Sequence, residues 1–157
     1  MRLILVRHGE TDANARRLAL GRADVPLNAR GRWQARRLAQ ALRRQPIAAV
    51  YSSPLARALD TARPIADGHG LTVVAEPGLI EMDIGEAEGL SFAEVRARFP
   101  EIQEGWASSD GPNQPMPGGE RLLDVQARAW GAIERLCRRH REETVVAVSH
   151  NFVILSL

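Results

Sequence analysis

The sequence is poor in cysteine, in aromatic residues and in long apolar runs. Cys137 is the only cysteine in 157 residues, so no disulfide can form within the chain, and this fits a reducing cytoplasm as its location. The apolar run after Met1 and Arg2 is too short for a signal peptide, and no stretch approaches the length of a membrane span. We therefore expect a cytoplasmic protein without a membrane partner, in which Cys137 is a small core residue of a helix.

Lysine is absent altogether, and all 21 basic side chains are arginine. A nucleotide-binding loop of the GxxxxGK type and a Schiff-base mechanism are thereby excluded, since both need a lysine amine. Arginine is suited to bind a phosphate or a carboxylate through two parallel hydrogen bonds. The net charge of +2 is too small to indicate a nucleic-acid partner by itself.

Alternating apolar segments predict a single α/β domain over residues 1–157. Strands that alternate with helices predict a three-layer α/β/α sandwich with a mostly parallel central sheet. The predicted strands cover residues 3–6, 47–53, 71–76 and 144–150. The predicted helices cover residues 28–44, 55–66, 91–99 and a segment that includes 122–136. Residues 105–119, which are rich in Gly, Pro, Ser and Asn, predict a long loop.

Two of the predicted strands end in a histidine, His8 and His150. The carboxyl ends of parallel strands meet at one edge of a sheet, where ligands bind in open α/β folds. We therefore expect these histidines to lie together, with Arg7 beside them and Arg57 one turn into the helix that begins at that edge. Two histidines and two arginines without a nearby Cys or Asp set make a poor metal site and a good site for a phosphoryl group.

Five motifs occur in a characteristic order: RHGETDAN, SSPLARALDTA, EMDIGEAEG, PGGE and VSHN. Their order and spacing resemble the histidine phosphatase superfamily, in its phosphoglycerate mutase-like branch, from Leu3 to His150. The resemblance implies a phosphoglycerate mutase-like fold and a reaction in which a histidine becomes phosphorylated. It implies no metal and no organic cofactor.

The resemblance also implies a role for each matching residue. His8 matches the nucleophile, and neighbouring arginines favour its neutral, reactive form. Glu81 matches the proton donor, which protonates the leaving oxygen and then activates water, while Glu86 and Glu88 remain alternatives for this role. The residues that match the phosphate contacts are Arg7, Asn14, Arg57 and His150.

Residues outside these matches carry predictions of their own. Arg22 is expected to contact a distal group of the substrate, and Trp106 and Met116 are candidates for lining the pocket. His69, in a turn flanked by glycines, and His140, in a basic cluster, are expected to be solvated.

Two departures from the family pattern bear on the site. Asn151 and Phe152 follow His150 where the family commonly has glycines, and Phe152 is expected to change the pocket wall or the packing behind it. Only seven residues follow His150, where the family continues with a helix and a strand, so Phe152, Ile154 and Leu155 lack their usual partners. We expect the natural chain to be longer, and a homodimer whose second subunit covers these residues is the alternative.

The sequence therefore predicts a phosphatase that hydrolyses phosphate monoesters of small metabolites through a phosphohistidine on His8. A phosphoglycerate mutase is the alternative within the family, although the mutases of this fold are considerably longer. A non-catalytic module that binds phosphate or nucleic acid is a remote alternative. The arginines of residues 28–44 have no interleaved aromatic residues, so an exposed helix face explains them better than a nucleic-acid partner.

Overall fold

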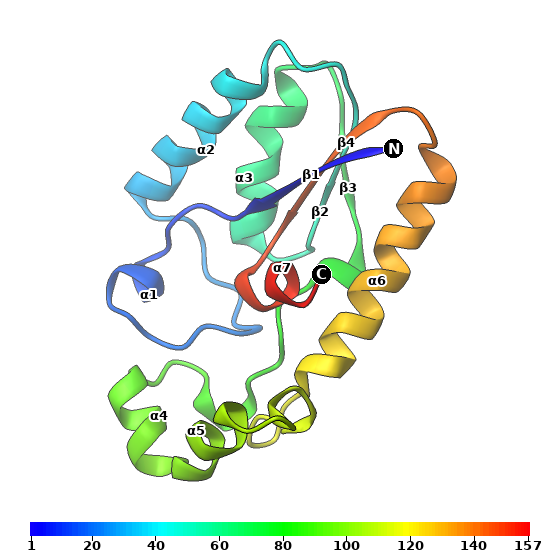
Figure 1. Cartoon of the computed structure of the whole chain (residues 1–157). Helices are drawn as coiled ribbons and strands as arrows, with labels where there is room; N and C mark the ends of the chain where they lie inside the picture. Colours follow the sequence, from blue (N-terminus) through cyan, green and yellow to red (C-terminus); the bar gives the residue numbers. More distant parts are fainter.

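The computed structural model describes all 157 residues and contains one sheet of four parallel strands (Figure 1). The strands stand in the order β1-β4-β2-β3, so the last strand of the sequence lies inside the sheet. Their bounds are β1 Arg2–Arg7, β2 Ile47–Ser52, β3 Val73–Ala75 and β4 Thr144–Ser149. The four predicted strands and the predicted α/β class are confirmed.

Seven α-helices and three short 3-10 turns connect or follow the strands. The α-helices are α1 Asp12–Ala15, α2 Ala29–Leu42, α3 Ala56–Asp67, α4 Phe92–Arg98, α5 Pro100–Ala107, α6 Leu122–Arg139 and α7 Asn151–Ser156. The 3-10 turns are η1 Pro77–Leu79, η2 Gly85–Ala87 and η3 Gly111–Asn113. No helix combines the length with the apolar character that crossing a bilayer requires.

Helices cover both faces of the sheet, as the three-layer prediction requires (Figure 1). α2 and α3 pack against each other, and Val146 of β4 joins Ala62 of α3 in the core on that side. α6 covers the opposite face, where Val145 of β4 joins Ala129 and Ile133 of α6. Because β4 is buried on both faces along its whole length, its sequence is an unbroken apolar run instead of an alternating one.

The prediction of a loop over residues 105–119 is partly wrong. α5 extends to Ala107, and residues Gly111–Asn113 form a 3-10 turn. Pro100 occupies the first turn of α5, where its missing amide hydrogen has no helical acceptor to lose. The Gly, Pro and Ser content of this segment favoured a loop prediction, although Pro100 is a residue type that is common at the start of a helix.

Two predictions of burial are also wrong. Cys137 is exposed, because it lies on the solvent face of α6 and not on the face that meets the sheet. His140 is buried, because its ring reaches back to the core after α6 ends, where its Nε2 lies 2.9 Å from the Tyr51 hydroxyl. Its Nδ1 lies 2.5 Å from a carboxylate oxygen of Glu143, so both ring nitrogens have partners. His69 is half-buried, so its predicted solvation is only partial.

The last residues form the short helix α7, whose apolar side chains were expected to lack partners. Phe152 has one, since its ring meets Trp106 edge to face with 5.5 Å between the ring centroids. Val153 is fully buried, whereas Leu155 is 70% exposed. Phe152 thus has a partner within the chain, and the expectation that these side chains lack the usual partners of the family stays a prediction.

Candidate active site

The carboxyl edge of the sheet brings His8 and His150 together. His8 directly follows β1 and His150 directly follows β4, which are hydrogen-bonded neighbours in the sheet. The backbone amide of His8 still donates to the Ser149 carbonyl at 3.0 Å, which extends the ladder to the histidine itself. The two ring centroids lie 5.1 Å apart, so the predicted convergence of these residues is observed.

His8 is held in one tautomer by its neighbour. Its Nδ1 lies 2.7 Å from the Gly9 carbonyl oxygen, so Nδ1 carries the proton and Nε2 keeps a free lone pair. Burial lowers the pKa of His8 from 6.5 to about 4, assisted by the charges of Arg57 and Arg7 and opposed by the Gly9 bond. The ring is therefore a neutral potential nucleophile at pH 7.

Gly9 is required at its position by a close backbone approach. A Cβ atom there would lie 2.6 Å from the carbonyl oxygen of Gly31, which lies in the first turn of α2. The Gly9 amide donates to Thr61 Oγ1 of α3 at 3.0 Å. The turn after His8 is thus fixed against both α2 and α3, which sets the direction of the imidazole.

His150 is fully buried and has one unpartnered ring nitrogen. Its Nε2 lies 2.7 Å from Ser53 Oγ, and its Nδ1 has no hydrogen-bond partner. Ser53 Oγ accepts the Leu55 amide at 3.3 Å, and in the tautomer in which its own proton goes to Nε2 the ring proton of His150 lies on Nδ1. Burial, and then the charge of Arg57, lowers the pKa of His150 to about 2. The neutral ring thus offers an N–H donor to an anion.

Arg57 is a buried cation without a carboxylate partner. Its side chain is fully buried, and its two terminal nitrogens donate to the carbonyls of Ala23 at 2.7 Å and Gly21 at 2.6 Å. Its Nε has no partner. Burial lowers the pKa of Arg57, opposed by the charges of Glu81, Glu88 and Asp24. A buried positive charge of this kind is stabilised when an anion binds beside it.

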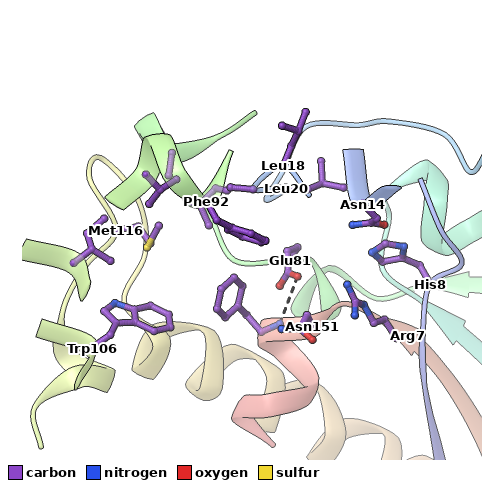
Figure 2. A pocket seen from close by; sticks show the side chains of 16 residues that line it. Arg7, His8, Asn14, Leu18, Leu20, Glu81, Phe92, Trp106, Met116 and Asn151 are labelled. Carbon is purple, nitrogen blue, oxygen red and sulfur yellow. Dashed lines mark hydrogen bonds between the residues drawn. The ribbon is translucent and has the colours of Figure 1, made fainter. Parts of the chain in front are cut away.

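Glu81 lies in the loop after β3 and is 3% exposed. One carboxylate oxygen accepts the Met82 amide at 2.8 Å, and the other accepts the Phe152 amide at 3.4 Å (Figure 2). Burial raises the pKa of Glu81, opposed by these amide bonds and by the charge of Arg57. A carboxyl group with a raised pKa can serve as a general acid near neutral pH.

The two alternatives to Glu81 lie elsewhere. Glu86 is exposed, and the carboxylate of Glu88 accepts the backbone amides of Gly21 at 2.9 Å and Ala23 at 3.2 Å. Neither residue lines the cavity that Glu81 shares with His8. The geometry therefore favours Glu81 for the acid role.

A cavity of about 440 Å³ opens beside these groups (Figure 2). Its polar end is lined by Arg7, His8, Asn14, Glu81 and Asn151. Eleven of its sixteen lining residues are apolar, including Leu18, Leu20, Phe92, Trp106, Met116 and Phe152. Trp106 and Met116 thus line the pocket as predicted, and Asn151 and Phe152 form part of its wall.

Asn14 is oriented by a capping box at the start of α1. Its Oδ1 accepts the Thr11 amide at 3.2 Å and the Thr11 hydroxyl at 3.0 Å. The Nδ2 amide of Asn14 is consequently the group left to donate to a ligand in the cavity.

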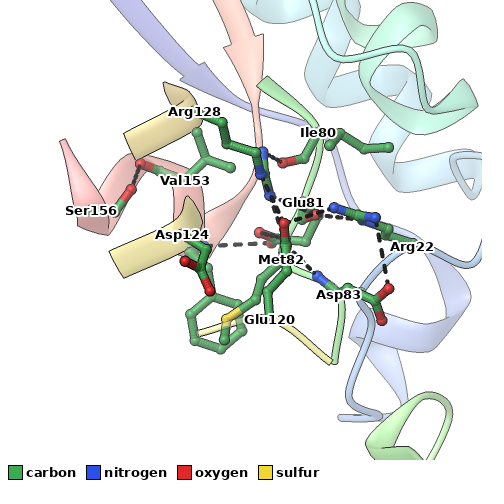
Figure 3. A network of polar contacts seen from close by, with 12 residues as sticks. Arg22, Ile80, Glu81, Met82, Asp83, Glu120, Asp124, Arg128, Val153 and Ser156 are labelled. Atoms are coloured by element: carbon green, nitrogen blue, oxygen red, sulfur yellow. Dashed lines mark hydrogen bonds and ion pairs between the residues drawn. The ribbon is translucent and has the colours of Figure 1, made fainter. Parts of the chain in front are cut away.

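Arg22 is not among the residues that line the cavity, and its predicted contact with a distal group of the substrate stays a prediction. Its Nε donates to the Glu81 carbonyl at 3.3 Å and its terminal nitrogen donates to Glu120 at 2.9 Å (Figure 3). Arg128 of α6 also donates to the Glu81 carbonyl, at 3.0 Å, and to Glu120, at 3.1 Å. Glu120 accepts the Asp83 amide at 2.8 Å. These side chains together fix the backbone from the Glu81 carbonyl to the Asp83 amide.

Sequence reasoning missed this network, although PGGE was recognised as a motif. Glu120 is the last residue of that motif, and one of its ion-pair partners in this structure is Arg128, for which the sequence carries no local signal. No group of three or more His, Cys, Asp or Glu side chains is placed to hold a metal ion.

Comparison with known proteins agrees with this geometry. The sequence profile of the histidine phosphatase superfamily (branch 1) matches residues 3–157. Phosphoserine phosphatase 1 of Hydrogenobacter thermophilus is 40% identical over 151 residues, which are 96% of this chain and 71% of that protein. Phosphoglycerate mutase-like protein 4 of Arabidopsis thaliana is 40% identical over 158 residues, which are 99% of this chain and 68% of that protein.

Solved structures show the same similarity. Bacillus stearothermophilus YhfR superposes with a TM-score of 0.90 at 36% identity, over 99% of this chain and 76% of that one. A mycobacterial glucosyl-3-phosphoglycerate phosphatase superposes with a TM-score of 0.91 at 32% identity, over 99% of this chain and 78% of that one. The chain therefore belongs to the histidine phosphatase superfamily, as its five motifs predicted.

Proposed function

We propose that the protein hydrolyses phosphate monoesters of small molecules through a phosphohistidine on His8. The observation that carries this proposal is the neutral His8 ring, whose Nδ1 is fixed on Gly9 while Nε2 is free beside a cavity that also holds the buried Glu81. Relatives named as phosphatases support hydrolysis, among them the metal-independent phosphoserine phosphatase of Arabidopsis thaliana at 35% identity.

The first step transfers the phosphoryl group to the protein. The Nε2 lone pair of His8 attacks phosphorus while the ester P–O bond breaks, and the leaving oxygen takes the proton of the Glu81 carboxyl group. The remaining phosphoryl oxygens carry negative charge that needs donors. We assign these donors to Arg7, Asn14 and Arg57 and to the Nδ1–H of His150.

The second step returns the protein to its starting state. The Glu81 carboxylate takes a proton from water, the resulting hydroxide attacks phosphorus, and the bond between Nε2 and phosphorus breaks. Inorganic phosphate leaves, His8 is again neutral and Glu81 is again protonated, so the cycle balances without a further reagent.

A phosphoglycerate mutase is the alternative, supported by relatives such as the probable phosphoglycerate mutase of Enterobacter at 32% identity. In that reaction the phosphohistidine returns its phosphoryl group to the substrate instead of to water. We favour hydrolysis, because the cavity offers no second cation to hold the carboxylate of phosphoglycerate. We also propose that the substrate is a small cytoplasmic metabolite and that nucleic acid is not a partner.

The test is release of p-nitrophenolate from p-nitrophenyl phosphate in the presence of EDTA. We expect turnover in the wild type and in His69→Ala, and no turnover above background in His8→Ala. Turnover that persists in His8→Ala would overturn the assignment of the nucleophile, and none in the wild type would overturn the proposed function.

A second variant separates the two steps. The p-nitrophenolate ion leaves without needing a proton, so Glu81→Gln should still phosphorylate His8 while water attack becomes slow. We expect a burst of one equivalent of p-nitrophenolate followed by a steady rate reduced about 10²–10³-fold. A uniform reduction without a burst would contradict the role of Glu81 in activating water.

A further inference from the structure

The active-site cavity has two chemically different ends. At the sheet edge it is lined by Arg7, His8, Asn14, Glu81 and Asn151, with Arg57 and His150 buried outside the lining, and beyond these groups the wall is apolar (Figure 2). The apolar wall comes from three separate segments, namely the residues after α1, the helix pair α4 and α5, and α7. The leaving group of a bound phosphate monoester has to occupy this second end.

The apolar wall presents aromatic surface that is not fully buried. Trp106 and Phe152 meet edge to face, and both are only half-buried. Phe92 of α4 is 54% exposed although its side chain belongs to the cavity wall. An apolar group in the cavity would remove this surface from water, which is favourable in proportion to the area covered.

The same wall carries no charged side chain. Although the chain has 21 arginines, Arg7 is the only one that lines the cavity, and it belongs to the polar end. Arg22 is paired with Glu120 and Asp83 instead. The charged residues of α4 and α5 are exposed and do not line the cavity; they are Glu94, Arg96, Arg98, Glu101 and Glu104. A carboxylate or ammonium group placed there would lose its hydration without meeting an opposite charge.

We propose that the preferred substrates are phosphate monoesters whose alcohol carries an extended apolar or aromatic group and neither a carboxylate nor an ammonium group. This inference rests on the proposed function, because it concerns the leaving group of that reaction. The cavity volume of about 440 Å³ lies in the range of small-molecule sites. Phosphoserine, which the name of one relative gives as its substrate, is thereby disfavoured for this chain.

The test compares three phosphate esters of primary alcohols: hexyl phosphate, O-phosphoserine and 3-phosphoglycerate. Their leaving oxygens are chemically alike, so differences in kcat/KM report mainly on how the cavity receives the rest of the molecule. We expect kcat/KM for hexyl phosphate to exceed that for the two charged esters by about 10²-fold. An equal or higher kcat/KM for either charged ester would overturn the proposal.

Variants of Phe92 test whether the apolar wall sets this preference. Phe92→Ser should lower kcat/KM for hexyl phosphate by about fivefold more than it lowers kcat/KM for phosphoserine. Phe92→Arg should also raise kcat/KM for 3-phosphoglycerate, because it supplies the missing cation. Trp33→Ser on α2 is the matched control, since Trp33 is 56% exposed and lies outside the cavity. A preference unchanged by both Phe92 variants would overturn the assignment of the wall.

Turnover of p-nitrophenyl phosphate and its loss in His8→Ala are measured on the same preparations. Normal turnover together with a preference for charged esters overturns the inference and leaves the proposed function standing. Absence of p-nitrophenyl phosphate turnover in the wild type overturns both.

Discussion

His150 and His140 are both buried histidines, but they differ in how their ring nitrogens are satisfied. His140 lies near the amino end of the sheet, and both of its nitrogens have partners, the Tyr51 hydroxyl and the Glu143 carboxylate. His150 lies at the carboxyl edge, and its Nδ1 has none. Because buried polar groups are nearly always paired, the unpaired nitrogen indicates a ligand, and the paired ring indicates a structural role.

The largest difference is expected in activity. His150→Asn should lower kcat/KM for p-nitrophenyl phosphate by about 10²–10³-fold, because a donor to the transferring phosphoryl group is lost. His140→Asn should leave kcat/KM within about twofold. Steady-state kinetics on both variants measure the contrast, and similar losses in the two would remove the distinction between the histidines.

The free energy of unfolding should depend on pH through His8 and His150, because the fold lowers the pKa values of both. The unfolded chain binds protons at His8 and His150 near pH 6.5, whereas the folded chain binds them only near about 4 and about 2. The unfolded state thus holds more protons below pH 6.5, so the free energy of unfolding falls as the pH falls from there toward 4. Each histidine contributes a slope of up to about 1.4 kcal/mol per pH unit.

Urea unfolding between pH 7 and pH 4 measures this slope. The double variant His8→Asn and His150→Asn should show a shallower loss of stability than the wild type, and His69→Asn serves as the control. Equal slopes in the double variant and the wild type would mean that the two rings do not stay neutral in the fold.

At neutral pH, His140 should matter for the free energy of unfolding, whereas it should matter little for activity. His140→Ala leaves the buried Tyr51 hydroxyl without its partner, which should reduce the free energy of unfolding by about 1–3 kcal/mol. The double variant His140→Ala with Tyr51→Phe removes both partners and should recover part of this loss. No recovery in that double variant would show that the ring acts through packing and not through its hydrogen bond.

The smallest effect is expected in the network behind Glu81. Glu120→Gln weakens the ion pairs with Arg22 and Arg128 that fix the Glu81 backbone, so Glu81 should be placed less well. We expect kcat for hexyl phosphate, whose leaving oxygen needs a proton, to fall about tenfold. The rate for p-nitrophenyl phosphate, whose leaving group needs none, should fall less.

The ratio of the rate for hexyl phosphate to the rate for p-nitrophenyl phosphate distinguishes a misplaced Glu81 from a general loss of fold stability in Glu120→Gln. A lower melting temperature with an unchanged ratio would show that Glu120 only stabilises the fold. Glu120→Asp, which keeps the charge, should restore part of the ratio if the network positions Glu81.

The sequence predicted most of the residues that meet in the candidate site, because these residues lie at the ends of elements with strong local patterns. His8 and His150 end apolar strands, and Arg57 begins a helix. The segment between residues 100 and 119 was predicted less well, since Gly, Pro and Ser dominate it and local composition outweighed the helix start at Pro100. His140 and Cys137 were assigned the wrong environments because burial depends on which face of α6 meets the sheet.

The sequence by itself determined the family, the parallel α/β class and the set of residues at the sheet edge, because each of these is encoded in contiguous motifs and hydrophobic periodicity. Only the tertiary structure decided which nitrogens of His8 and His150 remain free, how Arg22 is engaged and which residues line the apolar end of the cavity. The physical reason is distance along the chain: Arg22, Glu81, Glu120 and Arg128 meet only after the chain has folded. Contacts between such distant residues leave no local pattern in a single sequence.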